Sequence, residues 1–334
     1  MKVLITGGAG YIGSTVASAL EDGGHMPVII DSLVTGQRAF TEGHIFYQGD
    51  VADKELLKRV FTDHPDVDAT VHCAALIVVP ESVEQPYLYY RENVCKSLEL
   101  FRHLDDLGFP RVVFSSSASL YDAVPGFKVT ESSPLNPSSP YARTKYMMEL
   151  ALSDLAHATN LRGIALRYFN PIGADPEFRS GIHAREPSHV LGKLVDTALG
   201  KFPEFQITGT DWPTRDGSGI RDYIHVWDLA KAHVAAVERF DDVLSATGAP
   251  YAVINLGTGD GVTVKELVAA FERVWGQEIR KSEAPPRSGD VAGAYANADR
   301  AAELLGWQAE HSIDEGIESA LEWGRRRQEI LGYP

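Results

Sequence analysis

The first half of the chain alternates short apolar runs with longer amphipathic stretches. The apolar runs are rich in β-branched residues, as buried strands of parallel sheets are, and the stretches between them have helical periodicity. Strands are predicted at residues 2–6, 28–30, 45–47, 69–72, 112–114 and 163–167, and helices at residues 11–21, 54–61, 87–107 and 141–158. Because alternating strands and helices are joined by right-handed crossovers, the pattern predicts an α/β fold built on a doubly wound parallel sheet.

The alternation of strands and helices ends after Pro171, where turn-rich segments such as residues 172–187 and 209–219 interrupt shorter helices. We therefore predict a first domain of residues 1–170 and a smaller C-terminal α/β lobe of residues 171–334, with some later segments returning to the first domain. Ligands of open parallel sheets bind beyond the carboxyl ends of the strands. The second lobe is therefore expected to supply most of the substrate contacts.

Composition narrows the class of protein. The 334 residues are 44% hydrophobic and 23% charged, which provides enough apolar material for a sizeable core. The net charge of −15 argues against a polyanion-binding surface, so no nucleic-acid partner is expected. No apolar run reaches the ~18 residues of a membrane span, and residues 1–10 have the pattern of a strand rather than of a signal peptide. The two cysteines, Cys73 and Cys95, fit neither a disulfide framework nor a metal site, which favours a reducing cytoplasm and no bound metal.

A glycine-rich turn follows the first strand and opens the first helix. Gly7, Gly10 and Gly13 have the spacing GxxGxxG, which permits a tight turn, close approach of a pyrophosphate, and packing of helix on strand. The free N–H groups and the positive dipole end of the helix then face the phosphates. Asp31 ends the second strand 18 residues after Gly13, where a carboxylate can bind both hydroxyls of the adenosine ribose and repel a 2′-phosphate. The motif predicts a Rossmann-type site for NAD; the alternative is an ordinary turn with a capping aspartate.

Asp50 and Val51 end the third strand. From this position an aspartate side chain can reach the adenine amino group of the dinucleotide. The alternative is that Asp50 is the N-cap of the helix that starts near Lys54.

Tyr141 and Lys145 are four residues apart, so they lie on one face of the predicted helix. A free tyrosine has a pKa of about 10, but a nearby ammonium and a positive nicotinamide ring favour its phenolate. Such a phenolate can take a proton from a sugar hydroxyl while hydride leaves the same carbon, and Lys145 can also hold the nicotinamide ribose. Three serines, residues 115–117, end the preceding strand, and Ser117 is the candidate to hydrogen-bond the reacting oxygen. The alternatives are a solvent-facing amphipathic helix and serines that only solvate a strand end.

Several sequence pieces are more specific than the glycine motif, above all RYFNP (167–171) and RDYIHV (221–226). The others are TGGAGYIGS (6–14), residues 72–75, residues 81–82, Asn93, FSSSASLY (114–121), SPYARTK (139–145), LRYFNPIGA (166–174), DGSGIRDYIHVWDLA (216–230), NLGTG (255–259) and PRSGD (286–290). With these pieces the chain resembles, from Lys2 to about Trp307, the UDP-glucose (UDP-galactose) 4-epimerases of the extended short-chain dehydrogenase/reductase superfamily.

The resemblance implies one catalytic set and two binding sets of residues. Ser117, Tyr141 and Lys145 would carry out the chemistry. Contacts with NAD would come from Gly7, Gly10, Tyr11, Ile12, Gly13, Asp31, Ser32, Thr35, Gly36, Asp50, Val51, Cys73, Ala74, Ala75, Asn93, Ser115, Tyr141, Lys145 and Tyr168. The UDP-sugar would be held by Ser117, Tyr141, Asn170, His189, Val190, Gln206, Ile207, Thr208, Arg221, Arg287, Asp290 and Ala294. Residues 1–170 would then bind NAD and residues 171–334 the UDP-sugar.

The resemblance also implies an activity, the epimerisation of a UDP-hexose at C4 through a transient 4-keto sugar. NAD would act as a bound prosthetic group, because it is recycled within each turnover. A homodimer is implied as well, formed through the helices at residues 87–107 and 141–158. The alternative for these two helices is ordinary packing within one monomer.

The residues of the second lobe fit this substrate chemically. A diphosphate needs forked cationic donors, and Arg221 and Arg287 are suited to that role. Surface ion pairs are the alternative for these arginines. Asp290 suits a uridine ribose, with a loop-capping role as its alternative.

The chain departs from the family pattern at several positions. Ile77 stands where a lysine near the nicotinamide-side phosphates is common, which is expected to weaken NAD retention. His189 stands in place of an asparagine that commonly contacts the substrate, and Asp122 in place of a glycine. Ala294 aligns with the position that gates the C2 substituent of the sugar. Since alanine leaves room there, UDP-GlcNAc and UDP-GalNAc are expected to enter.

Three rival functions remain to be weighed. A 4,6-dehydratase usually has an Asp-Glu pair where this chain has Ala118 and Ser119, which argues against that reaction. A UDP-glucuronate 4-epimerase, or another NAD-dependent enzyme that modifies a sugar nucleotide, stays open. The extra donors that a glucuronate needs could come from Arg179, Arg185 and His189. A non-catalytic NAD-sensing protein is disfavoured, because it could lose the catalytic residues that this chain keeps.

Overall fold

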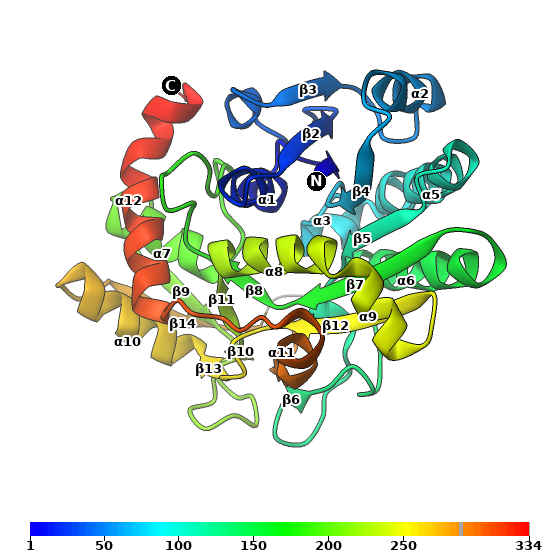
Figure 1. Cartoon of the computed structure of the whole chain (residues 1–334). Coiled ribbons are helices and arrows are strands. Elements are labelled where there is room, and N and C mark those ends of the chain that lie inside the picture. The colour runs from blue at the N-terminus through cyan, green and yellow to red at the C-terminus, as the bar shows by residue number, and fades with distance from the viewer. Residues whose placement is uncertain (287–289, 334) are drawn as a thin grey trace.

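The computed structural model, which describes residues 1–286 and 290–333, is built around a seven-stranded parallel sheet (Figure 1). The strands follow the order β12-β7-β5-β4-β1-β2-β3 across this sheet, and every neighbouring pair is parallel. Their bounds are β1 (Lys2–Thr6), β2 (Met26–Asp31), β3 (Ile45–Gln48), β4 (Val67–His72), β5 (Arg111–Ser115), β7 (Arg162–Tyr168) and β12 (Tyr251–Leu256). The predicted α/β fold with a doubly wound parallel sheet is confirmed.

Helices cover both faces of the sheet because the side chains of each strand alternate between the faces. On β1, Val3 and Ile5 belong to one buried cluster and Leu4 to the other. The first face is covered by α1 (Tyr11–Asp22), α8 (Val226–Glu238), α9 (Phe240–Thr247) and α11 (Asp299–Leu305). The second face is covered by α2 (Lys54–Asp63), α5 (Lys96–Leu107) and α6 (Pro140–Ala158).

The predicted elements of the first half all lie within observed ones, with two differences. The predicted helix at 87–107 contains a π-helical segment, η2 (Tyr90–Cys95), between α4 (Pro86–Tyr89) and α5; the short α3 (Val79–Glu84) precedes it. The π-helical segment is often found at functional sites. The second difference is β12, which lies far along the chain and pairs with β7 at the edge of the main sheet. The short segments η1 (Arg38–Thr41) and η3 (Ala118–Leu120) complete this region.

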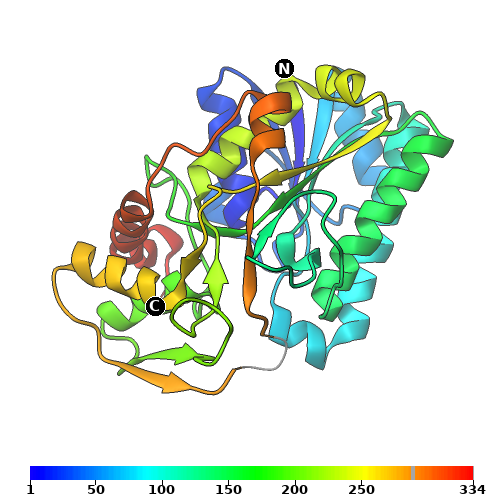
Figure 2. The ribbon, with the colours of Figure 1, turned by 90° about the horizontal axis from the view of Figure 1, so that it is seen from below.

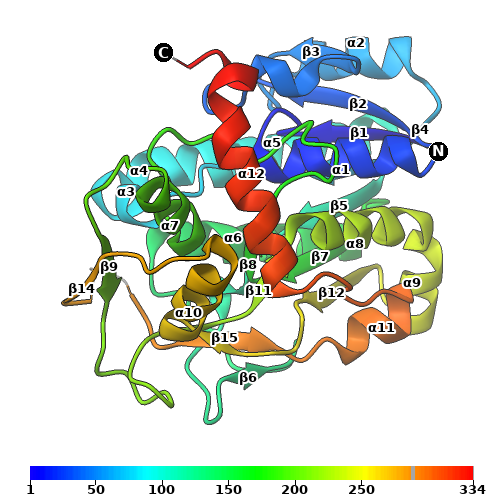
Figure 3. The same cartoon turned by 90° about the vertical axis from the view of Figure 1, so that its left-hand side faces the viewer.

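The second lobe has its own buried core, formed between three helices and short strands. Figure 3 shows α7 (Val190–Ala198), α10 (Val264–Trp275) and α12 (Ile313–Leu331) grouped there. The strands form one mixed four-stranded sheet and two parallel pairs: β13 (Val262–Thr263), β10 (Ile220–Arg221), β15 (Gly293–Ala296) and β6 (Lys128–Val129) in the first, β11 (Tyr223–His225) with β8 (Asn170–Ile172), and β14 (Lys281–Ala284) with β9 (Phe205–Thr208).

The orange strand β15 connects the two lobes (Figure 2). It pairs on one side with β10 of the second lobe and on the other with β6, which follows β5 and η3 in the chain. The ends of strands from both lobes therefore face one another across this strand. In the described part of the chain, no helix combines the length and the apolar character that crossing a membrane requires.

Candidate active site

The glycine turn lies between β1 and α1, where the backbone passes very close to the segment after β4. Gly7 has a φ of +76°, and a Cβ on it would lie 2.6 Å from the amide nitrogen of Ala74. A Cβ on Gly13 would run into the carbonyl of Gly7, so α1 packs on the turn only because that position is glycine. Gly10 is the N-cap of α1, and no side chain caps the helix. The first turn of α1 therefore offers its N–H groups to an anion, as a pyrophosphate site requires.

Asp31 is buried at the carboxyl end of β2, next to this turn. Its Oδ2 accepts from the N–H of Ala9 (3.0 Å) and its Oδ1 from the N–H of Leu33 (2.8 Å). A carboxylate has about four acceptor positions, so these two bonds fix its orientation and leave capacity for ribose hydroxyls. Gly36 passes close to this carboxylate, since a Cβ on it would lie 2.8 Å from Asp31 Oδ1. The other predicted contacts on this loop, Ser32 and Thr35, are exposed.

Asp50 does not cap the following helix. Asp53 does so, because its side chain accepts from the N–H groups of Glu55 (2.9 Å) and Leu56 (3.2 Å). Asp50 instead pairs with Lys96 (2.6 Å) at the surface, and the neighbouring Val51 is buried. The capping alternative for Asp50 is therefore wrong, which leaves its predicted role at the adenine as a prediction.

The segment after β4 is held by Asn93, which the π-helical segment points inward. Asn93 is fully buried; its Oδ1 accepts from the N–H of Leu76 (2.8 Å) and its Nδ2 donates to the Leu76 carbonyl (2.9 Å). Nδ2 also donates to Thr144 Oγ1 (3.1 Å) on α6. This arrangement fixes the backbone that carries the predicted contacts Ala74 and Ala75. Ile77, the residue in place of the usual lysine, is 64% exposed on the same segment.

Tyr141 and Lys145 point from α6 toward the carboxyl ends of β4 and β5. The Nζ of Lys145, which is 1% exposed, donates to the Ser115 carbonyl (2.8 Å) and lies 5.0 Å from the centre of the Phe114 ring. Burial lowers the pKa of Lys145 to about 8 and raises the pKa of Tyr141 to about 12, while a hydrogen bond with Ser117 lowers the latter. The solvent-facing alternative for this helix face is wrong.

The three serines at the end of β5 have different partners. Ser115 Oγ bonds to His233 Nε2 (2.8 Å) and Cys73 Sγ (3.1 Å), and Ser116 Oγ donates to the Glu149 carboxylate. Ser117, which caps η3, is the serine that bonds to the phenol of Tyr141. The geometry therefore supports Ser117 as the serine that faces a reacting oxygen.

Two further tyrosines were predicted to contact NAD. The hydroxyl of Tyr11 donates to the Gly173 carbonyl (2.7 Å) and so ties α1 to the start of the second lobe. Tyr168 lies in the cluster of Tyr141, Cys73 and Ser115; burial raises its pKa, and the first two groups add to the rise. Tyr168 is thus placed at the candidate catalytic cluster, and Ile12 packs against the core from the glycine turn.

A cavity of about 170 Å³ lies in the second lobe; Ser117, Tyr141 and Ala294, which were also predicted to hold the substrate, do not line it. The predicted residues that line it are Asn170, His189, Val190, Gln206, Thr208, Arg221 and Asp290. Sequence reasoning missed Pro171, Ile172, Leu191, Phe205, Trp212, Gly219, Tyr223, Val264 and Val291, which also line it. Ile207 does not line the cavity, since its side chain is buried in the core of the lobe. Arg287 lies outside the described residues.

His189 is the N-cap of α7, and its Nδ1 accepts from the N–H of Gly192 (3.1 Å). Burial lowers the pKa of His189 to about 4, so the ring is neutral at pH 7 and carries its proton on Nε2. Among residues 1–286 and 290–333, this Nε2 has no hydrogen-bond partner. His189 therefore caps α7 through Nδ1 and has one donor, Nε2–H, left for another partner.

Arg221 is anchored to the backbone at the cavity wall. Its guanidinium donates to the carbonyls of Ile220 (2.7 Å), Ala292 (2.9 Å) and Val291 (3.1 Å). In the same sheet, Ala294 of β15 is paired with Arg221 of β10. Arg221 is thus held as a rigid cation beside the cavity, with Ala294 next to it.

Two of the donors proposed for a glucuronate carboxylate have other partners. The Nε of Arg179 donates to both carboxylate oxygens of Asp175 (3.0 Å for each), and its Nη1 and Nη2 donate to Asp22 (2.8 and 2.9 Å). Arg185 stacks over the ring of Tyr333, 4.7 Å from its centre. Neither arginine lines the cavity, so of that donor set only His189 does.

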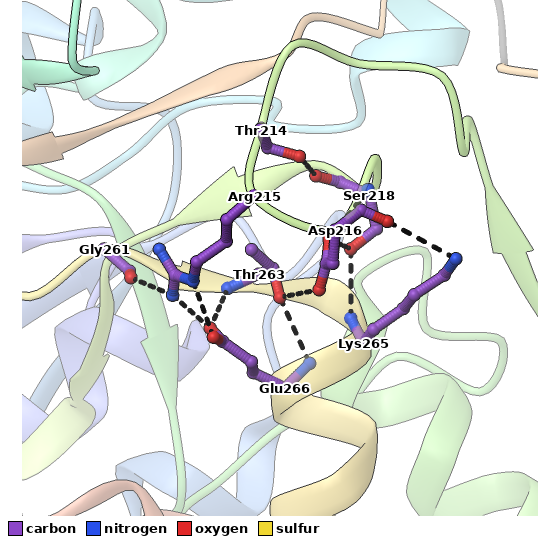
Figure 4. A network of polar contacts seen from close by, with 8 residues as sticks. All are labelled: Thr214, Arg215, Asp216, Ser218, Gly261, Thr263, Lys265 and Glu266. Carbon is purple, nitrogen blue, oxygen red and sulfur yellow. Dashed lines mark hydrogen bonds and ion pairs between the residues drawn. The ribbon is translucent and has the colours of Figure 1, made fainter.

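The loop at residues 209–219, which supplies one wall of the cavity, is tied to the start of α10 (Figure 4). Arg215 Nε donates to Glu266 (2.6 Å), whose carboxylate also accepts from the N–H of Thr263 (2.9 Å) in a capping box. Thr263 Oγ1 in turn donates to Asp216 (2.5 Å). These contacts join the second half of the loop to the N-terminus of α10 and so fix its position next to the cavity.

Comparison with known proteins supports the resemblance inferred from the sequence. The family model described as "NAD dependent epimerase/dehydratase family" matches residues 3–257. The chain belongs to this family. It is 42% identical to a UDP-glucose 4-epimerase of Azospirillum brasilense (99% of this chain and 94% of the relative) and 39% identical to that of Bacillus subtilis (100% and 99%).

Solved structures agree with this assignment. A UDP-glucose 4-epimerase from Stenotrophomonas maltophila, with bound NAD and formylated UDP-arabinopyranose, has a TM-score of 0.92 at 37% identity, over 98% of this chain and 99% of that one. The enzyme from Bifidobacterium longum, in complex with NAD⁺ and UDP, has a TM-score of 0.91 at 34% identity over 100% of both chains. The predicted family, and NAD as the cofactor of that family, are confirmed.

The burial of Lys145 predicts a pH-dependent stability that a Lys145→Met variant removes. Between about pH 8 and the ~10.4 of an unfolded lysine, the folded chain has released the proton and the unfolded chain retains it, so a rise in pH favours folding. We therefore expect the stability of Lys145→Met relative to wild type to fall by about 3 kcal/mol between pH 7 and pH 10.5. Urea unfolding at several pH values measures this difference; a difference that does not change with pH would contradict a depressed pKa.

Proposed function

We propose that this protein is an NAD-dependent UDP-hexose 4-epimerase. The observation that carries the proposal is the buried cluster of Ser117, Tyr141 and Lys145 at the strand ends, together with a cavity of the second lobe that Arg221 lines. An acid–base pair for oxidising a hydroxyl and an anchored cation for a diphosphate are the two things that this reaction needs.

The residues around the glycine turn fit NAD. Side chains at Gly7 or Gly13 would fill the space against the backbone, and the uncapped start of α1 provides N–H donors for phosphates. The fixed carboxylate of Asp31 suits the two ribose hydroxyls of NAD and disfavours a 2′-phosphate. Bound there, NAD would supply the hydride acceptor for C4 of the hexose and the hydride donor for its return.

The chain's own residues would move the proton and hold the substrate. Tyr141 takes the proton of the 4-hydroxyl and later returns it, while Ser117 hydrogen-bonds the same oxygen. The Lys145 ammonium stabilises the phenolate. Arg221 and Asp290 hold the UDP portion in the cavity, so that the hexose, with few anchors of its own, can turn and present its other face.

Two rivals fit the site less well. A UDP-glucuronate epimerase needs cations for the sugar carboxylate, and Arg179 and Arg185 are engaged elsewhere. A non-catalytic NAD sensor does not need Lys145 and Tyr141, and burial of the Lys145 ammonium lowers the stability of the folded chain. Since Cys73 and Cys95 are both free, we place the enzyme in the reducing cytoplasm.

The proposed activity predicts turnover that depends on the Tyr141 hydroxyl. Purified protein should interconvert UDP-glucose and UDP-galactose, and Tyr141→Phe should lower kcat by about 1,000-fold because the general base is lost. Chromatography of the epimers measures this, with UDP-GlcNAc and UDP-glucuronate in parallel and each reaction run with and without added NAD. Stimulation by NAD would fit weak retention at Ile77.

Tyr146→Phe is the matched control, since Tyr146 lies on the same helix outside the cluster. It should keep kcat within about twofold of wild type. Turnover of UDP-glucuronate alone would move the substrate to the rival, and no product from any sugar with added NAD would contradict an epimerase.

Ala294 is proposed to admit an N-acetyl group at C2 of the sugar. It is the small residue paired with Arg221, which lines the cavity, although Ala294 itself does not line it. Wild type should therefore turn over both UDP-GlcNAc and UDP-glucose. Ala294→Tyr should lower kcat/KM for UDP-GlcNAc at least about 50-fold, and for UDP-glucose by only a few-fold, because the ring occupies the space of the acetyl group. Equal losses for both sugars would contradict a gate at this position.

A homodimer is proposed through α5 and α6. These neighbouring helices expose the apolar side chains of Leu98, Met147 and Leu150 to solvent. Met147→Glu with Leu150→Glu should weaken the dimer about 100-fold or more, because two charges would be buried without partners. Sedimentation velocity measures this, with Ile330→Glu on α12 as the control for an exposed apolar residue elsewhere. A monomeric wild type would contradict the proposal.

A further inference from the structure

A buried ion pair lies directly behind the candidate catalytic cluster. Glu149 of α6 and Arg167 of β7 have side chains that are 4% and 5% exposed. Arg167 Nε donates to Glu149 Oε1 (2.9 Å) and Nη2 donates to Oε2 (2.6 Å), which is a forked, charge-assisted contact. Sequence reasoning assigned no role to either side chain.

Glu149 continues the spacing of the candidate catalytic residues along α6. Tyr141, Lys145 and Glu149 follow one another at intervals of four residues, so they share one face of the helix. The Glu149 carboxylate also accepts from Ser116 Oγ, which lies between Ser115, the acceptor of the Lys145 ammonium, and Ser117. The Glu149 carboxylate thus contacts the end of β5, which carries Ser117 and the carbonyl that binds Lys145.

The pair extends to the end of a third strand. Arg167 Nη1 donates to the hydroxyl of Tyr121 (3.1 Å), which donates to Asn255 Oδ1 (2.6 Å) on β12. The N–H of Asn255 donates to Glu131 (2.8 Å). The ends of β5, β7 and β12 are therefore joined by one polar network.

Stability alone does not account for such a pair. The cost of removing two charges from water offsets much of their attraction, and apolar residues of the same volume are often as stabilising. The Glu149 carboxylate lies one helical turn after Lys145, and this position suits it to act on the catalytic residues.

We propose that Glu149 is a positioning residue for the candidate catalytic set: its carboxylate keeps the Lys145 ammonium charged and holds the end of β5 against α6. This inference rests on the proposed function for its consequence in catalysis. Its electrostatic part concerns Lys145 itself and can be measured without turnover.

The charge argument depends on which groups face Lys145. His72, Cys73 and Glu149 interact electrostatically with Lys145. His233 and Tyr168 contact Ser115, whose carbonyl accepts from the Lys145 ammonium, and Tyr141 lies one helical turn before Lys145. Burial lowers the pKa of His72 to about 3 and of His233 to about 4, and it raises the pKa of Cys73 to about 11 and of Tyr141 to about 12; it also raises that of Tyr168. At pH 6–9 these groups are neutral. Cys73 and then Glu149 raise the pKa of Lys145 that burial lowers. Since the Cys73 thiol keeps its proton over this pH range, Glu149 supplies the negative charge among the described residues that interact with Lys145.

Groups packed on Glu149 do not replace its charge. Arg167 is its cation, and Tyr121 and Tyr251 have pKa values that burial raises, so both stay protonated. Removal of the carboxylate would therefore leave Lys145 without this negative charge, which disfavours the ammonium.

The test uses Glu149→Gln, which removes the charge and keeps the shape. The pH at which Lys145 loses its proton is read from the stability difference between each chain and its Lys145→Met derivative, by urea unfolding from pH 6 to 10.5. In the wild type this difference should begin to close near pH 8, and in Glu149→Gln about one pH unit lower. The alkaline limb of kcat for UDP-glucose should move in the same direction by a similar amount.

Arg167→Lys is the structural control, because it keeps both charges and breaks the forked contact. It should lower kcat without moving either pH midpoint. If Glu149→Gln fails to fold, Glu149→Gln with Arg167→Gln leaves no unpaired charge and should still shift the midpoint of Lys145 to lower pH. An unmoved Lys145 midpoint in the charge-removing variants, or an equal shift in Arg167→Lys, would overturn the inference. An inactive wild type with a shifted midpoint would instead count against the proposed function alone.

Discussion

The site depends on one constraint, the close backbone approach between the turn after β1 and the segment after β4. At Gly7 a side chain would meet Ala74 backbone atoms within 3 Å, and at Gly13 it would meet the turn itself. This approach sets how deep α1 sits on the sheet. It also fixes the position of the backbone just after β4, and hence the position of Cys73 relative to the end of β5. The candidate catalytic cluster is assembled on that edge.

A second tie joins this edge to the cavity of the other lobe. The buried carboxylate of Asp222 accepts from Thr258 N (2.8 Å) and Oγ1 (2.7 Å), Gly259 N (3.1 Å) and Ala296 N (3.1 Å). Its backbone carbonyl accepts from the N–H of Asn170 (3.0 Å). The loop after β12, the strand β15 and the start of β8 therefore meet at one residue, which directly follows Arg221. Asp222 therefore fixes the positions of Arg221 and Asn170, the predicted contacts of the diphosphate and the sugar, relative to each other.

Local chemistry made part of this predictable from the sequence. The glycine turn, Asp31 and the Tyr141–Lys145 spacing each depend on neighbours within one strand–turn–helix unit, and their geometry follows from that unit alone. Glu149 extends the same spacing by one more turn, so the helix periodicity alone indicates that it shares a face with Tyr141 and Lys145.

Other features depend on contacts between distant segments. No local pattern shows that β12 joins the sheet beside β7, or that Arg179 is engaged by Asp22 and Asp175. Ile207 was expected at the substrate, but alternation along β9 turns it into the core while Gln206 and Thr208 face the cavity. Trp212 and Tyr223 likewise line the cavity only because the folded second lobe brings their distant segments together.

Burial acts on the two candidate catalytic groups in opposite directions, and this has a consequence for control of the chemistry. The pKa of Tyr141 is raised to about 12 and that of Lys145 is lowered to about 8, so at neutral pH the phenol keeps its proton while the ammonium is only moderately stable. The chain's own charges therefore do not suffice to ionise Tyr141. A further positive charge beside the phenol, such as the oxidised nicotinamide ring carries, would favour the phenolate. Proton removal is then restricted to the state in which the oxidised cofactor is in place, and the Glu149 carboxylate contributes by keeping Lys145 charged until that state is reached.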